Sequence, residues 1–235
     1  MKESENKGEL IMIAAPTKMG KTSFGLTLFS LGVMHFSEKI LWVSPKMKKE
    51  WIVKMLLTNL SCKVFGNNDD SQVKTDFANE IISSFEIDKM IVEFPHSFNL
   101  KSFLTNNVEK PDIKPNYIII DNFEILKNSD SENINNLINE LKKIAIELCI
   151  QIIVLYECEF SNNMEEEFDY SNINLDFDTE LVDILCFLHR PEYYRIPFYT
   201  NGESTLGDAS FLVYKHNQLM CEYQMKYDPL NFRFY

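Results

Sequence analysis

The chain has 235 residues, 45% of them apolar and 25% charged, with a formal net charge of −12 at pH 7. This composition excludes a largely disordered chain, and the length suffices for one α/β domain with a sizeable core. An acidic protein repels phosphate backbones, so the charge counts against nucleic-acid binding.

The sequence shows no signal for a membrane or a secretory route. No apolar run reaches the length of a membrane span, and the opening residues MKESENKGE lack the apolar core of a signal peptide. We therefore expect a cytoplasmic protein without a membrane attachment. We expect residues 1–8 to form an N-terminal tail and residues 9–235 to form one domain.

Apolar runs and helix-periodic segments alternate along the first part of the chain. Runs typical of strands buried on both faces span 9–15, 39–44, 90–95, 116–126 and 151–157. Helical periodicity spans 21–36, 48–60 and 131–150, and Ser131 is a candidate cap for the last of these helices. The polar residues 66–88 are expected to form a loop that leads into a helix.

The C-terminal part has a strand-rich pattern. Strands are expected at 181–190 and 209–217, on either side of a turn-rich stretch whose Asn201-Gly202 pair fits a hairpin turn. Residues 221–235 add strand-like alternation. The whole pattern predicts an α/β fold with a mostly parallel sheet, helices on both faces and antiparallel C-terminal strands. Ligands of such sheets bind at the carboxyl ends of the strands.

Residues 15–22 read APTKMGKT, between a predicted strand and a predicted helix. A turn of this kind points successive backbone N–H groups at one spot, and the helix N-terminus adds its positive dipole end. Gly20 allows close approach to phosphate oxygens, Lys21 would reach the terminal phosphates and the Thr22 hydroxyl would ligate Mg²⁺. The predicted nucleotide-binding residues are Ala15, Pro16, Thr17, Lys18, Met19, Gly20, Lys21 and Thr22.

The strict phosphate-loop pattern has glycine where this chain has Ala15, so the context of the motif matters. About a hundred residues later the buried run YIIID ends at Asp121, a carboxylate suited to hold the water shell of Mg²⁺. The sequence therefore predicts that ATP or ADP binds with Mg²⁺, and that Thr22 and Asp121 hold the metal.

Several segments, in order, resemble the C-terminal RecA-like motor domain of the DnaB-type replicative helicases. GELIMIAAPTKMGKTSFGLTL is similar to the opening of that domain, YIIIDNFEIL to its IDYLQL, and LVDILCFLHRPEYY to its ADLIMFIYRDEYY; ASFLVYKHNQ takes the place of its AEIIIAKQRNG. The resemblance covers the chain from Gly8 to the C-terminus. It implies a RecA-like P-loop NTPase fold of three layers, a role in DNA replication, and a homo-oligomer or a helicase-like partner.

The chain departs from this family at positions that carry its catalysis. Lys46 stands where the family has the Glu that polarises the attacking water, and a protonated lysine has no acceptor for that task. Glu157 stands in place of the Gln that senses the γ-phosphate, and Asn217 in place of the finger Arg supplied by a neighbouring subunit. The DNA-facing loop of the family falls on residues 157–180, which hold nine carboxylates and no Lys or Arg. These changes point to weak or lost hydrolysis and count against DNA binding.

Three hypotheses of function remain open at this stage. The first is a nucleotide-binding domain with weak or lost hydrolysis and an accessory or regulatory role. The second is an active hexameric helicase or translocase. Its chemistry would be restored if the alignment with the family were shifted by one or two residues, if Glu50 were a substitute carboxylate, or if Arg190 or Arg195 were the finger. The third is a non-motor interaction protein that no longer binds nucleotide.

Overall fold

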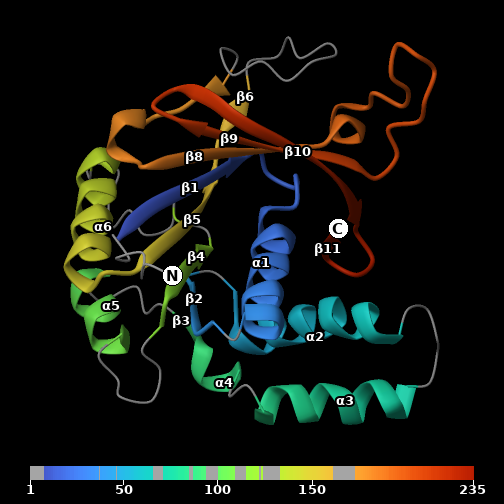
Figure 1. Cartoon of the computed structure of the whole chain (residues 1–235), viewed down its shortest axis with the longest axis horizontal. Helices are drawn as coiled ribbons and strands as arrows, with labels where there is room; N and C mark the ends of the chain where they lie inside the picture. Colours follow the sequence, from blue (N-terminus) through green and yellow to red (C-terminus); the bar gives the residue numbers. More distant parts are fainter. Residues whose placement is uncertain are drawn as a thin grey trace, which may run out of the picture.

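A nine-stranded sheet runs through the described part of the chain, in the order β11-β10-β9-β8-β1-β5-β4-β2-β3 (Figure 1). The computed structural model describes residues 8–36, 38–45, 47–65, 71–84, 87–93, 100–108, 115–121, 123, 133–160 and 173–235. The parallel strands are β1 (Glu9–Ala15), β2 (Ile40–Ser44), β3 (Ile91–Glu93), β4 (Tyr117–Asp121), β5 (Gln151–Glu157) and β8 (Ile184–His189). The antiparallel strands are β9 (Asp208–Lys215), β10 (Gln218–Asp228) and β11 (Arg233–Phe234).

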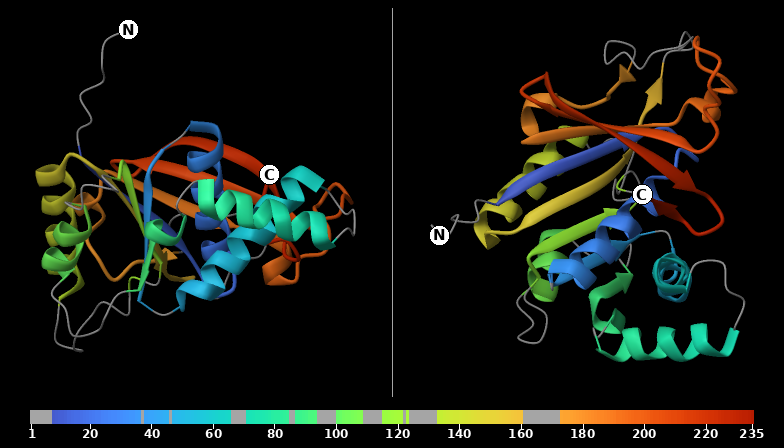
Figure 2. Two further views of the ribbon diagram at one scale, coloured as in Figure 1. Left: turned by 90° about the horizontal axis from the view of Figure 1, so that it is seen from below. Right: turned by 45° about the vertical axis from the view of Figure 1, so that its right-hand side comes forward.

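Helices cover both faces of this sheet, and Figure 2 shows the sheet between the two helical layers. One face packs against α1 (Lys21–Phe36), α2 (Lys49–Phe65) and α4 (Ile87–Met90), and α3 (Ser71–Ser84) packs against α2 and α4. The other face packs against α5 (Leu100–Val108) and α6 (Ile134–Leu148). Short 3-10 helices, η3 (Thr179–Leu181) and η4 (Pro191–Tyr194), flank β8, and β6 (Glu159–Phe160) pairs with β7 (Ile173–Asn174) in a separate sheet.

The strand β1 illustrates why the apolar runs of this sequence become buried strands. Leu10, Met12 and Ala14 belong to the core cluster on the α6 side, whereas Ile13 and Ala15 belong to the cluster on the α1 side. Successive side chains of a strand point to opposite faces, so a strand covered on both sides must be apolar at every position. The predicted three-layer α/β fold, with parallel strands followed by antiparallel C-terminal strands, is confirmed.

The register brings the carboxyl ends of three strands together at one edge of the sheet. Ala15, the last residue of β1, pairs with Glu157, the last residue of β5. Asp121, the last residue of β4, pairs with Leu155 of the same β5. We call this side the carboxyl edge; the opposite side, where the parallel strands begin, is the amino edge.

Some predicted boundaries were wrong. The helix α6 is capped by Asn133, whose side chain accepts the N–H of Asn135, and not by Ser131, which lies outside the described residues. A cap must directly precede the first helical turn, and Ser131 is three residues before Ile134. In the stretch 66–88, expected to be a loop that leads into a helix, the structure has the helix α3 from Ser71, and α4 starts at Ile87.

The predicted strand 209–217 ends two residues earlier, because His216 and Asn217 form the turn between β9 and β10. Both have positive φ, 49° and 59°, which matches a two-residue hairpin turn that follows the twist of its strands. The Asn201-Gly202 prediction holds as a local turn, since the Gly202 N–H donates to the Tyr199 carbonyl, 2.9 Å away. Among the described helices, none combines the length and the apolar character that a membrane crossing requires. The predicted tail, 1–8, lies outside the described residues except for Gly8.

Candidate nucleotide-binding site

Residues 15–22 form a tight connection between the end of β1 and the start of α1, at the carboxyl edge. Lys18 and Gly20 adopt positive φ values of 64° and 104°. The Met19 N–H donates to the Pro16 carbonyl, 3.3 Å away, and the Met19 side chain is buried. A strand, a loop with left-handed turns and a helix N-terminus are the components of an anion-binding site made of backbone amides.

The Lys21 ammonium lies folded back over this loop. Its Nζ donates to the carbonyls of Ala15, at 2.7 Å, and Pro16, at 3.0 Å, and lies 3.9 Å from Glu157 Oε2. The Glu157 side chain is 46% exposed, whereas that of Lys21 is only 11% exposed. The register of β1 and β5 thus brings a carboxylate next to the cation that would bind the terminal phosphates.

Thr22 and Asp121 meet directly at the carboxyl edge. The Thr22 hydroxyl donates to the Asp121 carboxylate, with oxygen–oxygen distances of 3.0 and 3.3 Å, and Asp121 is almost completely buried. A hydroxyl that ligates Mg²⁺ directly and a carboxylate that holds its water shell need this proximity. The pair fits the metal predicted from the sequence: Thr22 would ligate it and Asp121 would hold its water shell.

One altered position, Asn217, lies apart from this group. Asn217 is in the β9–β10 turn, at the amino edge, where its Oδ1 accepts the Thr179 hydroxyl at 3.0 Å. The strand β9 runs antiparallel to β8, with Ser210 opposite His189 and Tyr214 opposite Leu185. It therefore ends at the amino edge, where β8 begins. Asn217 is therefore distant from the phosphate loop of its own chain.

Two of the predicted features extend beyond the described ranges. Lys46 lies outside the described residues, as do residues 161–172 of the acidic stretch. Glu50, the proposed substitute carboxylate, is exposed in the first turn of α2. Among the described residues, no group of three His, Cys, Asp or Glu side chains is arranged to hold a metal ion.

Sequence reasoning missed the position of Arg190 next to the loop. Arg190 is 9% exposed, its Nη1 donates to the Met19 carbonyl at 3.3 Å, and it forms an ion pair with Glu192. The sequence offered Arg190 only as an alternative finger, because an arginine directly after a strand carries no pattern that predicts burial. A buried guanidinium bound to its own loop is not placed to reach a neighbouring subunit.

Glu192 holds Arg190 by its charge. Burial by itself would raise the pKa of Glu192, but hydrogen bonds from the Gly207 amide and from Arg190, together with the Arg190 charge, bring it below its usual value. The Gly207 N–H lies 3.0 Å from Glu192 Oε2. Glu192 is therefore ionised at neutral pH, and the ion pair is maintained.

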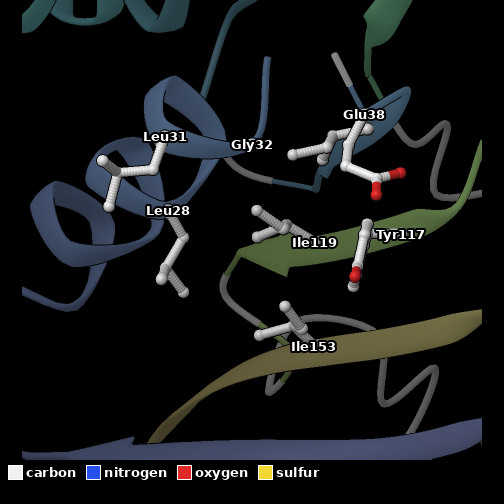
Figure 3. A pocket seen from close by; sticks show the side chains of 8 residues that line it. Leu28, Leu31, Gly32, Glu38, Tyr117, Ile119 and Ile153 are labelled. Carbon is white, nitrogen blue, oxygen red and sulfur yellow. The ribbon is translucent and has the colours of Figure 1, made fainter. Parts of the chain in front are cut away.

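An apolar hollow lies on the α1 face of the sheet, away from the phosphate loop (Figure 3). It has a volume of about 350 Å³ and lies between α1 and the amino ends of β2 and β4. Leu28, Leu31, Ile119 and Ile153 line it, together with the acidic Glu38. It contains no residue of the predicted nucleotide site.

Comparison with known proteins identifies the family. The family described as "DnaB-like helicase C terminal domain" matches residues 3–234. The chain belongs to this family. The match spans the phosphate loop, Asp121 and the C-terminal strands, so the DnaB-type resemblance predicted from the sequence is confirmed.

Curated and structural relatives agree with this assignment. The chain is 26% identical over 230 residues to a "Probable plasmid replicative DNA helicase" of Chlamydia psittaci, covering 90% of this chain and 47% of that relative. The chain thus spans about half the length of the curated relative that it matches.

Two solved structures share the fold, each with a TM-score of 0.74 and 18% identity. One is described as a DnaB-like replicative helicase and its interactions with primase, and the match includes 98% of the present chain and 57% of that structure's chain. The other is described as an ATPase domain, and the match includes 97% of the present chain and 84% of that structure's chain. At this level of identity they establish the RecA-like fold of DnaB ATPase domains.

Proposed function

We propose that this DnaB-like domain binds ATP or ADP with Mg²⁺ through residues 15–22 and Asp121, and hydrolyses ATP slowly or not at all. The observation that carries the proposal is the placement of Lys21 and Thr22. Lys21 lies at the mouth of the loop, and the Thr22 hydroxyl lies 3.0 Å from Asp121. Backbone amides, one ammonium and a hydroxyl–carboxylate pair are sufficient to hold a polyphosphate with its metal.

One contact at the same edge of the sheet, and two substitutions in the sequence, disfavour fast hydrolysis. Glu157, at the end of β5, would place a negative charge near a bound triphosphate, and it already interacts with Lys21. Lys46 offers no carboxylate for orienting water. Loss of a finger arginine lowers the rate by about 10³- to 10⁵-fold in related enzymes. Binding without rapid turnover suits an accessory or regulatory role in DNA replication, in the cytoplasm.

One observation favours the second candidate, an assembly of copies that is an active translocase. The β9–β10 turn, with Lys215 and Asn217, lies at the edge opposite to the phosphate loop of its own chain. Copies arranged head to tail would bring this turn to the loop of a neighbour. The exposed Lys215 would then supply a cation, although not the planar guanidinium of a finger arginine.

A titration with fluorescent ATP and ADP analogues in the presence of Mg²⁺ tests the proposal. We expect saturable binding to the wild type and a loss of about tenfold or more in affinity for Lys21→Ala. Lys39→Ala, which removes a lysine at the amino edge, is the matched control and is expected to bind as the wild type does. Absence of saturable binding by the wild type would refute the proposal and favour the interaction protein.

A further inference from the structure

Three side chains that lie outside the phosphate-loop motif meet one peptide of that loop. Arg190 directly follows β8, Tyr227 is near the end of β10, and Phe234 is in β11. All three converge on the peptide between Met19 and Gly20. We call them the loop-holding group.

Arg190 is fixed from several sides. Its Nη1 lies 3.3 Å from the Met19 carbonyl oxygen, and its guanidinium carbon lies 3.9 Å from the centre of the Tyr227 ring. Its Nη2 donates to Glu192, which in turn accepts the Gly207 N–H. A guanidinium that is stacked, paired and buried has little freedom, so it holds the carbonyl that it contacts in one direction.

The direction of this carbonyl decides where an amide points. The described residues contain no cis peptide bond, and in a trans peptide the C=O of one residue and the N–H of the next point in opposite directions. Because Arg190 holds the Met19 carbonyl on its own side, the Gly20 N–H must point to the other side. For the Gly20 amide to bind a phosphate, the phosphate must lie on that side.

The aromatic rings hold Gly20 itself. A Cβ placed on Gly20 would lie 3.1 Å from Phe234 Cζ and 3.5 Å from Tyr227 Cε2, so the two rings pack against the glycine backbone. Their centroids lie 4.6 Å apart. Gly20 has a φ of 104°, which a side chain would strain in any case.

The last strand is itself tied to α1 and α2 by buried polar groups. The Phe234 N–H donates to Thr27 Oγ1 at 3.2 Å, and Asn59 Nδ2 donates to the Phe232 carbonyl at 2.7 Å. Thr27 and Asn59 are both buried. The ring of Phe234 is therefore held at Gly20 by hydrogen bonds far from the loop in sequence.

We propose that Arg190 is a positioning residue for nucleotide binding, which together with Tyr227 and Phe234 holds the Met19–Gly20 peptide with the Gly20 amide directed at the phosphate. This inference rests on the proposed nucleotide binding and extends it to residues beyond the phosphate-loop motif. The loop is thereby set for its ligand before the ligand arrives, and affinity depends on the C-terminal strand.

Two measurements on the full chain test this role. The first is the affinity for a fluorescent ADP analogue with Mg²⁺; the second is residue-resolved hydrogen exchange of the amides of residues 19–21 without nucleotide. Arg190→Gln is expected to weaken binding about tenfold, the loss typical of one charged hydrogen bond, and to accelerate exchange at these amides. Arg195→Gln, at an arginine in the same segment, is the matched control and is expected to change neither.

A milder pair of variants keeps the test informative if Arg190→Gln does not fold. Phe234→Leu removes the ring from Gly20 but keeps an apolar side chain, and is expected to weaken binding several-fold with faster exchange at Met19, whose N–H donates to the Pro16 carbonyl. Tyr235→Leu, at the neighbouring 66% exposed ring, is its control. Arg190→Lys restores the charge without the planar fork and is expected to recover only part of the affinity.

The outcomes separate this inference from the proposed function. If the wild type binds and Arg190→Gln or Phe234→Leu binds equally well, with unchanged exchange at residues 19–21, the positioning role is overturned while nucleotide binding stands. If exchange accelerates throughout the sheet and affinity is unchanged, the role is structural only and the inference also fails. If the wild type does not bind nucleotide, the proposed function fails. In that case the holding of the Met19–Gly20 peptide by Arg190 and Phe234 stands only if exchange in the variants accelerates at residues 19–21 alone.

Discussion

Thr22 and Asp121 are 99 residues apart in the sequence, yet the Thr22 hydroxyl lies 3.0 Å from a carboxylate oxygen of Asp121. This contact joins the first turn of α1 to the end of β4. It exists because β4 and β1 are parallel strands on either side of β5, and both end at the carboxyl edge.

Asp121→Asn is expected to abolish the gain in nucleotide affinity that Mg²⁺ provides. The amide keeps the shape of the side chain but removes the negative charge that would hold the water shell of the metal. Titrations with a fluorescent ATP analogue, with Mg²⁺ and with EDTA, measure this gain directly. Glu147→Gln, an exposed carboxylate on α6, is the control; a Mg²⁺ dependence that survives in Asp121→Asn would contradict the assigned role.

Glu157→Gln is expected to tighten ATP binding by about two- to fivefold. The carboxylate lies 3.9 Å from Lys21 Nζ, so it competes with phosphate for the ammonium. The effect is small because Glu157 is half-exposed, and exposed pairs are worth up to about 1 kcal/mol. The gain is expected to be larger for ATP than for ADP.

The neighbouring Glu159→Gln serves as the control for this change, because it removes an exposed carboxylate two residues away, in β6. Equal gains from both variants would mean that general surface charge, and not the contact with Lys21, sets the affinity. Weaker ATP binding by Glu157→Gln would show that the carboxylate assists the nucleotide.

Asn217→Arg, placed in a Lys46→Glu background, is expected to raise ATP turnover only at protein concentrations at which the chains associate. The β9–β10 turn lies at the amino edge, so an arginine there cannot reach the phosphate loop of its own chain. Turnover per chain, measured across a dilution series alongside sedimentation, checks this. A gain that persists in dilute monomer would contradict the described position of the turn.

His189 is expected to make the fold less stable as the pH falls from about 6.5 to 4. Burial lowers the pKa of His189 from 6.5 to about 4, so in this window the unfolded chain binds a proton that the folded chain does not. The contribution, about 3 kcal/mol at most, is complete above pH 6.5 and lost as the pH approaches 4.

Urea unfolding of the wild type and His189→Phe at several pH values measures this contribution. Phe keeps a ring against Tyr194, with which His189 stacks, but does not titrate. As the pH falls, the unfolding free energy of the wild type should decrease more than that of His189→Phe. A parallel pH dependence in wild type and His189→Phe would exclude the buried imidazole as the cause.

Much of the fold could be predicted because its signals are local. The runs at 9–15 and 151–157 are apolar at nearly every position, and this is what burial on both faces requires of strands such as β1 and β5. The tight connection at 15–22 could be placed between a strand and a helix because an apolar run ends at Ala15 and helical periodicity starts at Lys21. Asp121 could be linked to it because both follow buried strands, which end at the same edge of a parallel sheet.

Other features depend on contacts between segments that are distant in the sequence. The contact of Lys21 with Glu157 depends on the register of β1 and β5, and no pattern in either segment reveals it. Arg190 was considered only as an alternative finger because two of its partners, Met19 and Tyr227, are far away along the chain. Ser131 was preferred as a cap on residue type alone, whereas the start of α6 at Ile134 is fixed by its packing against the sheet.

A single-turnover experiment, with the chain in excess over ATP labelled at the γ-phosphate and with Mg²⁺ present, tests the central claim most directly. Binding with weak hydrolysis predicts that the label is retained by the protein and remains in ATP for many minutes. Release of labelled phosphate at about 1–100 s⁻¹, the range of active phosphoryl-transfer enzymes, would contradict it, and so would failure of the protein to retain any label.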